Sequence, residues 1–159
     1  MNWDIFDFAV FGAMLLGVGV VYALARRRAN NTTYRFGIGV ALAAAFLLVW
    51  INGAVGIIGD SNNDANMMFF GVLLVGVVGA IIARLQPKGM ARAMYATAFS
   101  QALVAVIALA ANLGLAGPSW PWDVLVLSAF FTALWLLSAS LFRKATRHPL
   151  SDPLIRQRF

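Results

Sequence analysis

Residues 67–85 read MMFFGVLLVGVVGAIIARL, an almost entirely apolar run. It contains no charged residue before Arg84. An α-helix rises about 1.5 Å per residue, so about 20 such residues cross a hydrocarbon core of about 30 Å. The stretch lacks the alternation of polar and apolar residues that a membrane β-strand needs. It therefore predicts a membrane-spanning α-helix.

Four more apolar runs of similar length lie on either side of this stretch, at residues 6–25, 36–58, 94–116 and 123–142. The connecting segments are short, and Pro87, Pro118 and Pro121 mark turns between runs. We predict an all-α protein: an integral membrane bundle of five transmembrane helices in residues 1–142. Residues 143–159 would form a basic cytoplasmic tail.

The composition supports lipid as the main solvent of this chain. Hydrophobic residues make up 62% of the sequence and charged residues 11%. Soluble domains are about 45–50% apolar and about one quarter charged. A soluble domain of 159 residues could not bury so much apolar surface.

The charged residues are sorted by side in the five-helix prediction. All 12 lysines and arginines fall on one side, and of the six acids only Asp152 joins them. Positively charged loops stay in the cytoplasm. We therefore expect the N-terminus outside and the C-terminus in the cytoplasm.

Ala23-Leu24-Ala25 has the form of a signal-peptidase cleavage site. The preceding Met1-Asn2-Trp3-Asp4 lacks the basic start of a signal peptide, so we expect the first helix to be retained.

Groups that carry chemistry are scarce. The chain has no cysteine, which excludes thiolate metal sites and cysteine nucleophiles, and its one histidine, His148, excludes bis-histidine haem ligation within one chain. No ionisable residue lies near the middle of a predicted span. The nearest, Asp7, is expected to cap the first helix. We therefore expect no catalytic residue, no metal or cofactor, and a protein that is not an enzyme.

Uncharged polar residues follow single faces of the predicted helices. In the fourth run, residues 97, 101, 105, 108 and 112 share a face, because they are three or four positions apart. Such faces can hold helices together, since small residues allow close approach and amides bond across the contact. They can also line a polar cleft for a small solute. The candidates for either role are Asn52, Gln101, Asn112, Ser128 and Thr132.

The predicted tail contains a cluster of bases, interrupted by two prolines. Bases next to a membrane attract anionic lipid headgroups, and a cytoplasmic partner protein is the alternative. Nucleic acid is not expected, because no binding fold organises the bases. The candidate docking residues are Arg143, Lys144, Arg147, Arg156 and Arg158.

One part of the chain resembles a family. Residues 50–59 read WINGAVGIIG, an acidic and Asn-rich turn ending in Ala65-Asn66 follows, and residues 89–93 read GMARA. With residues 98–109, these segments resemble small bacterial membrane proteins with no assigned function. The resemblance implies a location in the bacterial cytoplasmic (inner) membrane and does not indicate an activity.

These observations favour a non-enzymatic accessory or assembly subunit that packs against a larger membrane complex. Expected partners are membrane lipids and other membrane-protein subunits or further copies of the chain. The alternative is a small-solute channel, exporter or ligand-binding membrane protein that uses a polar cleft between helices.

Overall fold

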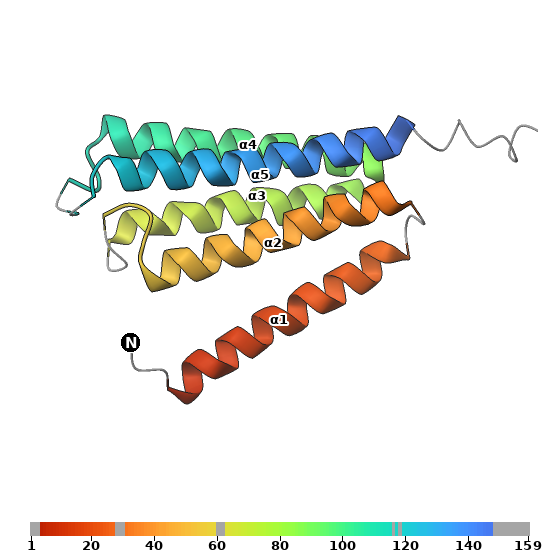
Figure 1. Ribbon diagram of the computed structural model, residues 1–159, viewed down its shortest axis with the longest axis horizontal. Helices are drawn as coiled ribbons and strands as arrows, with labels where there is room; N and C mark the ends of the chain where they lie inside the picture. The colour runs from red at the N-terminus through yellow and green to blue at the C-terminus, as the bar shows by residue number, and fades with distance from the viewer. Residues whose placement is uncertain (1–3, 28–30, 60–62, 116, 118, 148–159) are drawn as a thin grey trace, which may run out of the picture.

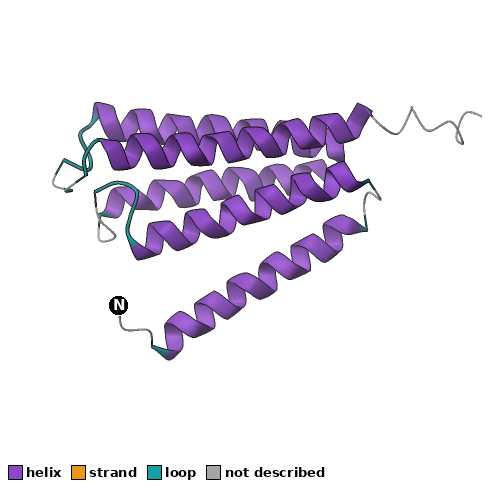
Figure 2. Ribbon diagram, viewed as in Figure 1, coloured by secondary structure: helices purple, strands orange, loops and turns teal. Residues whose placement is uncertain are grey.

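The computed structural model describes residues 4–27, 31–59, 63–115, 117 and 119–147. In these residues it is all-helical, with loops between the helices (Figure 2). Five helices are long and apolar enough to cross a membrane. The elements are α1 (Ile5–Arg26), α2 (Thr32–Ala54), the short 3-10 helix η1 (Asp64–Met67), α3 (Met68–Ala83), α4 (Pro87–Ala110) and α5 (Trp122–Arg147).

Four of the helices form the body of the bundle, and α1 lies at its edge (Figure 1). The helix α4 packs against α3 and α5, and α5 also packs against α2. The helices α2 and α3 touch only slightly. The substantial contacts of α1 are all with α2, and Ala25 is the only buried residue among the 22 of this helix.

Small residues bring the helices close together. A Cβ atom on Gly79 of α3 would lie 2.7 Å from the Cβ of Ala93 on α4, and one on Gly76 would lie 3.2 Å from Oγ1 of Thr97. On the opposite side of the bundle, a Cβ on Gly37 of α2 would lie 3.2 Å from the ring of Phe142 on α5. Such close backbone approach is how helices associate in lipid, where no hydrophobic force drives them together.

The ends of α2 and α4 differ from the predicted bounds, and local backbone chemistry explains why. The helix α2 begins at Thr32 rather than residue 36, because the Asn31 side chain caps it by accepting a hydrogen bond from the Thr33 amide at 2.9 Å. It ends at Ala54 rather than residue 58, and Gly56 beyond it has φ 81°.

The helix α4 begins at Pro87 rather than residue 94, since proline suits the first helical position. It ends at Ala110 rather than residue 116, where Asn112 takes a left-handed φ of 52°.

Differences from the predicted bounds also occur in α3 and α5. The helix α3 ends at Ala83 rather than residue 85, because Arg84 and Leu85 have φ values of 52° and 59°. The helix α5 begins at Trp122 and continues past residue 142 to Arg147. Arg143 and Lys144 are therefore helical residues rather than the start of a tail. The rest of the predicted tail, residues 148–159, lies outside the described residues.

The two ends of the bundle carry opposite charges. The end that we call the acidic end holds all the described acids, Asp4, Asp7, Asp64 and Asp123. The end that we call the basic end, on the right in Figure 1, holds every described lysine and arginine: Arg26, Arg27, Arg35, Arg84, Lys88, Arg92, Arg143, Lys144 and Arg147.

Candidate functional site

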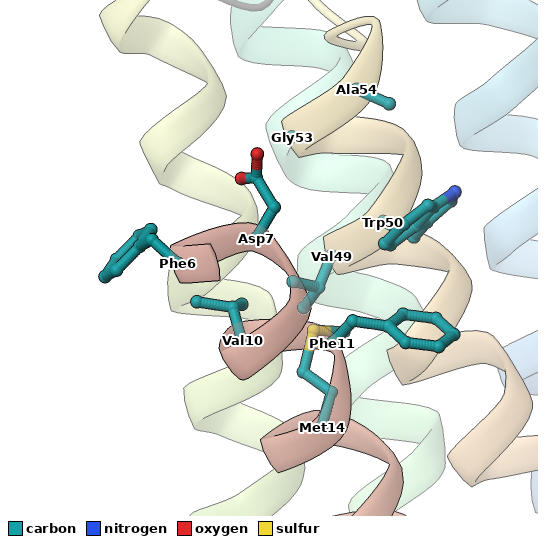
Figure 3. A pocket seen from close by; sticks show the side chains of 9 residues that line it. All are labelled: Phe6, Asp7, Val10, Phe11, Met14, Val49, Trp50, Gly53 and Ala54. Carbon is teal, nitrogen blue, oxygen red and sulfur yellow. The ribbon is translucent and has the colours of Figure 1, made fainter. Parts of the chain in front are cut away.

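The seam between α1 and α2 contains a pocket of about 210 Å³ at the acidic end. Figure 3 shows Asp7 directed toward the end of α2 that carries Gly53, whereas Phe6 points away from α2. Apart from Asp7, the lining is apolar and aromatic: Phe6, Val10, Phe11, Met14, Val49, Trp50, Gly53 and Ala54.

Asp7, the one ionisable residue of this pocket, caps its own helix. Its carboxylate accepts a hydrogen bond from the Asp4 amide at 3.2 Å, and the Asp4 carboxylate accepts one from the Asp7 amide at 2.9 Å. This reciprocal pair satisfies backbone groups that the first turn leaves unpaired. The helix-capping role expected for Asp7 is therefore confirmed.

Aromatic side chains hold α1 against α2 beside the pocket. The ring of Phe11 meets Trp50 edge-on, with centroids 5.1 Å apart, and meets Phe46 at 5.7 Å. Phe46 and Trp50 stack with an interplanar angle of 6°. Such pairs contribute about 0.5–1.5 kcal/mol each beyond their buried area. The two pairs made by Phe11 join α1 to α2, and the stacked Phe46 and Trp50 present one aromatic surface of α2 to it.

A groove continues along the α1–α2 seam toward the basic end. It comprises two adjoining hollows of about 560 Å³ and 470 Å³, which share Tyr22, Gly39 and Ala43. Gly19 of α1 and Gly39 of α2 both line it, and a Cβ added to either glycine would meet nothing within 4 Å. We call this surface the small-residue groove. It is lined by Leu15, Val18, Gly19, Tyr22, Thr32, Arg35, Phe36, Gly39, Val40, Leu42, Ala43, Phe46 and Leu47.

The predicted polar candidate Asn52, near the end of α2, is hydrogen-bonded to the loop between α2 and α3 at the acidic end. Its Nδ2 donates to the backbone carbonyl of Asn66 at 3.0 Å. The Asn66 side chain in turn accepts from the amides of Ile57 and Ile58, at 3.0 and 2.8 Å, and donates to the Ile58 carbonyl at 3.2 Å. Asn52 and Asn66 together fasten the loop between α2 and α3. The sequence reasoning singled out Asn52 and missed the larger part played by Asn66.

Gln101 and Ser128 are buried in the body of the bundle. Gln101 on α4 has no exposed surface, and Ser128 on α5 is 3% exposed. Neither amide atom of Gln101, nor the Ser128 hydroxyl, has a hydrogen-bond partner among the described residues. An unpaired buried polar group costs about 1–3 kcal/mol. The indole Nε1 of Trp135 on α5 is likewise buried without a partner among the described residues, so the tightly packed pair α4 and α5 contains three unsatisfied polar side chains.

The remaining two polar candidates are less deeply buried than Gln101 and Ser128. Thr132 is half-buried on α5, and Asn112 is exposed beyond the end of α4. Neither residue lines the pocket or the groove at the α1–α2 seam. The structure therefore distributes the five predicted polar residues over a loop contact, a buried helix pair and an exposed helix end.

The predicted docking residues divide at the end of α5. Arg143 and Lys144 are exposed on this helix, and Arg147 is its last residue. Arg156 and Arg158 lie outside the described residues. A hollow of about 290 Å³ joins Arg143 to bases that the sequence reasoning had not grouped with it, Lys88 and Arg92 of α4. The spacing of Lys88, Arg92 and Tyr95 along one helix face is the sequence signal that could have found them.

No protein-family model, curated protein or solved structure matches this chain. The site is therefore interpreted from its own geometry. That geometry offers a loosely packed helix with a groove of small residues, a buried unpaired amide, and a concentration of bases at one end.

Proposed function

We propose that this chain is a non-enzymatic accessory or assembly subunit of a larger membrane complex, and that a partner transmembrane helix packs in the small-residue groove. The observation that carries the proposal is the state of α1. This helix is long enough to span a membrane, yet it packs on one neighbour and buries one residue within the chain.

Exposed apolar side chains on α1 do not by themselves indicate a partner, because lipid also covers apolar side chains. The glycines of α1 are stronger evidence for a partner helix. A Cβ on Gly12, Gly17 or Gly19 would meet nothing within 4 Å, so the chain itself does not use the close approach that glycine permits. Glycine in a helix costs about 0.5–1 kcal/mol relative to alanine. Small residues at such positions are typical of contacts between transmembrane helices.

The position of the groove also favours a helix as the occupant. It runs along two helices, is lined mainly by apolar residues, and contains Gly19, Gly39 and Ala43 where another backbone could approach. A second copy of the chain would present the same surface and is the simplest partner. The alternative partner is a different membrane-protein subunit.

The proposed location is the bacterial inner membrane, and the charge distribution supports an orientation with the basic end in the cytoplasm. Basic segments are retained on the cytoplasmic side. This orientation would place Asp4 and the acidic end outside, with the end of α5 inside. Anionic headgroups of the inner leaflet would then be expected partners of the basic end.

The proposal is tested by extraction in a mild detergent followed by native mass spectrometry. We expect the chain to leave the membrane with a partner subunit or a second copy. Gly19→Leu and Gly39→Leu fill the groove and should release that partner. Gly71→Leu is the matched control, because Gly71 is equally open but lies on α3, outside the groove. A lone monomer from wild-type membranes, or equal loss in the control, would count decisively against the proposal.

The second candidate function is a small-solute channel, exporter or ligand-binding protein, and Gln101 is the observation that favours it. Its amide is fully buried without a partner among the described residues, and a polar ligand that entered the bundle would pair with it. Flux through reconstituted vesicles that Gln101→Leu abolishes would favour this function over the first.

A further inference from the structure

We propose that the basic end carries a specific site for one anionic phospholipid headgroup, between the first turns of α4 and the last turns of α5. The site is the hollow of about 290 Å³ lined by Lys88, Ala91, Arg92, Tyr95, Arg143 and Thr146. The inference rests on the proposed contact of the basic end with the inner leaflet, but the site is separate from the small-residue groove and does not depend on what binds there.

Three cations from two helices converge on this hollow without a counter-charge. Lys88 and Arg92 belong to α4, Arg143 belongs to α5, and all three are exposed. None of them forms an ion pair within the part of the chain that the structure describes. The described acids all lie at the other end of the bundle. A phosphate diester would therefore find uncompensated positive charge here.

The start of α4 adds to this potential. Pro87 occupies its first turn, and the side chain of the preceding Gln86 makes no capping hydrogen bond. The positive end of the helix dipole is therefore left open to an external anion, next to the side chain of Lys88. The Tyr95 hydroxyl supplies a further donor, since it has no hydrogen-bond partner among the described residues.

Exposed apolar residues continue from the hollow toward the middle of the bundle, which favours a lipid over a free phosphate. Phe99 lies two turns beyond Arg92 on the same face of α4 and is 70% exposed. Leu136 lies two turns before Arg143 on the same face of α5 and is 43% exposed. Acyl chains can lie against these residues while the phosphate occupies the hollow. Tyr95, between the two regions, is placed where aromatic residues meet headgroups.

The site is tested on the purified full chain in a non-ionic detergent, by native mass spectrometry during titration with dioctanoyl phosphatidylglycerol. We expect one tightly bound lipid. Each base near a membrane surface contributes about 1 kcal/mol, which is about fivefold in affinity. Arg92→Gln and Arg143→Gln should therefore each weaken binding by about fivefold, and the double variant by about 25-fold. Arg143→Lys keeps the charge and should stay within about twofold.

The matched controls are Arg26→Gln and Arg27→Gln, which remove the same charge at the same end of the bundle but outside the hollow. We expect less than about a twofold change in either. Equal losses in site and control variants would show a diffuse basic surface and overturn the proposal. Equal binding of dioctanoyl phosphatidylcholine would overturn it as well. Inorganic phosphate that binds as tightly as the lipid would replace the lipid site with a free-phosphate site.

Discussion

The Ser138 hydroxyl on α5 donates a hydrogen bond to the backbone carbonyl of Gly37 on α2, with 2.8 Å between the oxygens. Both residues are buried, and the ring of Phe142 packs beside Gly37. We expect Ser138→Ala to lower the free energy of unfolding in detergent by about 1 kcal/mol, because such bonds between membrane helices contribute about 0.6–2 kcal/mol. Ser140→Ala is the control. Ser140 is exposed and donates to Leu136 in its own helix, so the change should be smaller.

Gly79→Ala and Gly71→Ala should change stability in opposite directions. A Cβ on Gly79 would lie 2.7 Å from the Cβ of Ala93, so α3 and α4 must separate, at a cost of about 1–3 kcal/mol. A Cβ on Gly71, in the same helix, meets nothing, and alanine there should stabilise by about 0.5–1 kcal/mol. Thermal unfolding in detergent measures both. The same sign for the two variants would refute the close contact of α3 with α4.

Asn66→Leu should destabilise the loop between α2 and α3 strongly. The side chain carries the hydrogen bonds to the amides of Ile57 and Ile58, and each buried amide left unpaired costs about 1–3 kcal/mol. Asn66→Asp loses the Nδ2 donor to the Ile58 carbonyl but keeps the oxygen that accepts from both amides, so it should retain more stability than Asn66→Leu. Chemical unfolding of the two variants side by side checks the prediction, which fails if Asn66→Leu behaves as wild type.

Gln101→Leu should leave stability unchanged or raise it by about 1 kcal/mol. Its amide is fully buried without a partner among the described residues, and an apolar side chain of similar size removes that penalty. Thr97→Val, on the same helix, should instead cost about 1 kcal/mol, because Thr97 is equally buried but donates to the Ala93 carbonyl at 2.8 Å. Marked destabilisation by Gln101→Leu would show that the folded protein pairs this amide.

The sequence was sufficient to predict five apolar helices, because hydropathy over about 20 residues is a strong signal. Helix ends were harder. Lys88 and Arg92 looked like a loop, yet Pro87 starts α4 there and the charged side chains remain at the basic end. Hydropathy does not indicate the left-handed backbone conformations of Arg84 and Asn112, at which α3 and α4 end.

The packing of the helices against one another could not be predicted from the sequence. The hydropathy of α1 is similar to that of the other helices, so it does not show that α1 would pack mainly on α2. Whether a buried amide such as Gln101 finds a partner likewise depends on the shape of the neighbouring helices. The grouping of Arg92 with Arg143 required the pairing of α4 with α5, which brings together residues far apart in the chain.

We propose that five crossings place the basic end of the bundle in the cytoplasm. The chain has no cysteine, so single introduced cysteines can be labelled without background. Ser119 lies between α4 and α5 at the acidic end, and Gln86 lies between α3 and α4 at the basic end. Both residues are exposed. In intact cells, a membrane-impermeant maleimide should label Ser119→Cys and reach Gln86→Cys only after permeabilisation. Labelling of Gln86→Cys from outside would contradict the account.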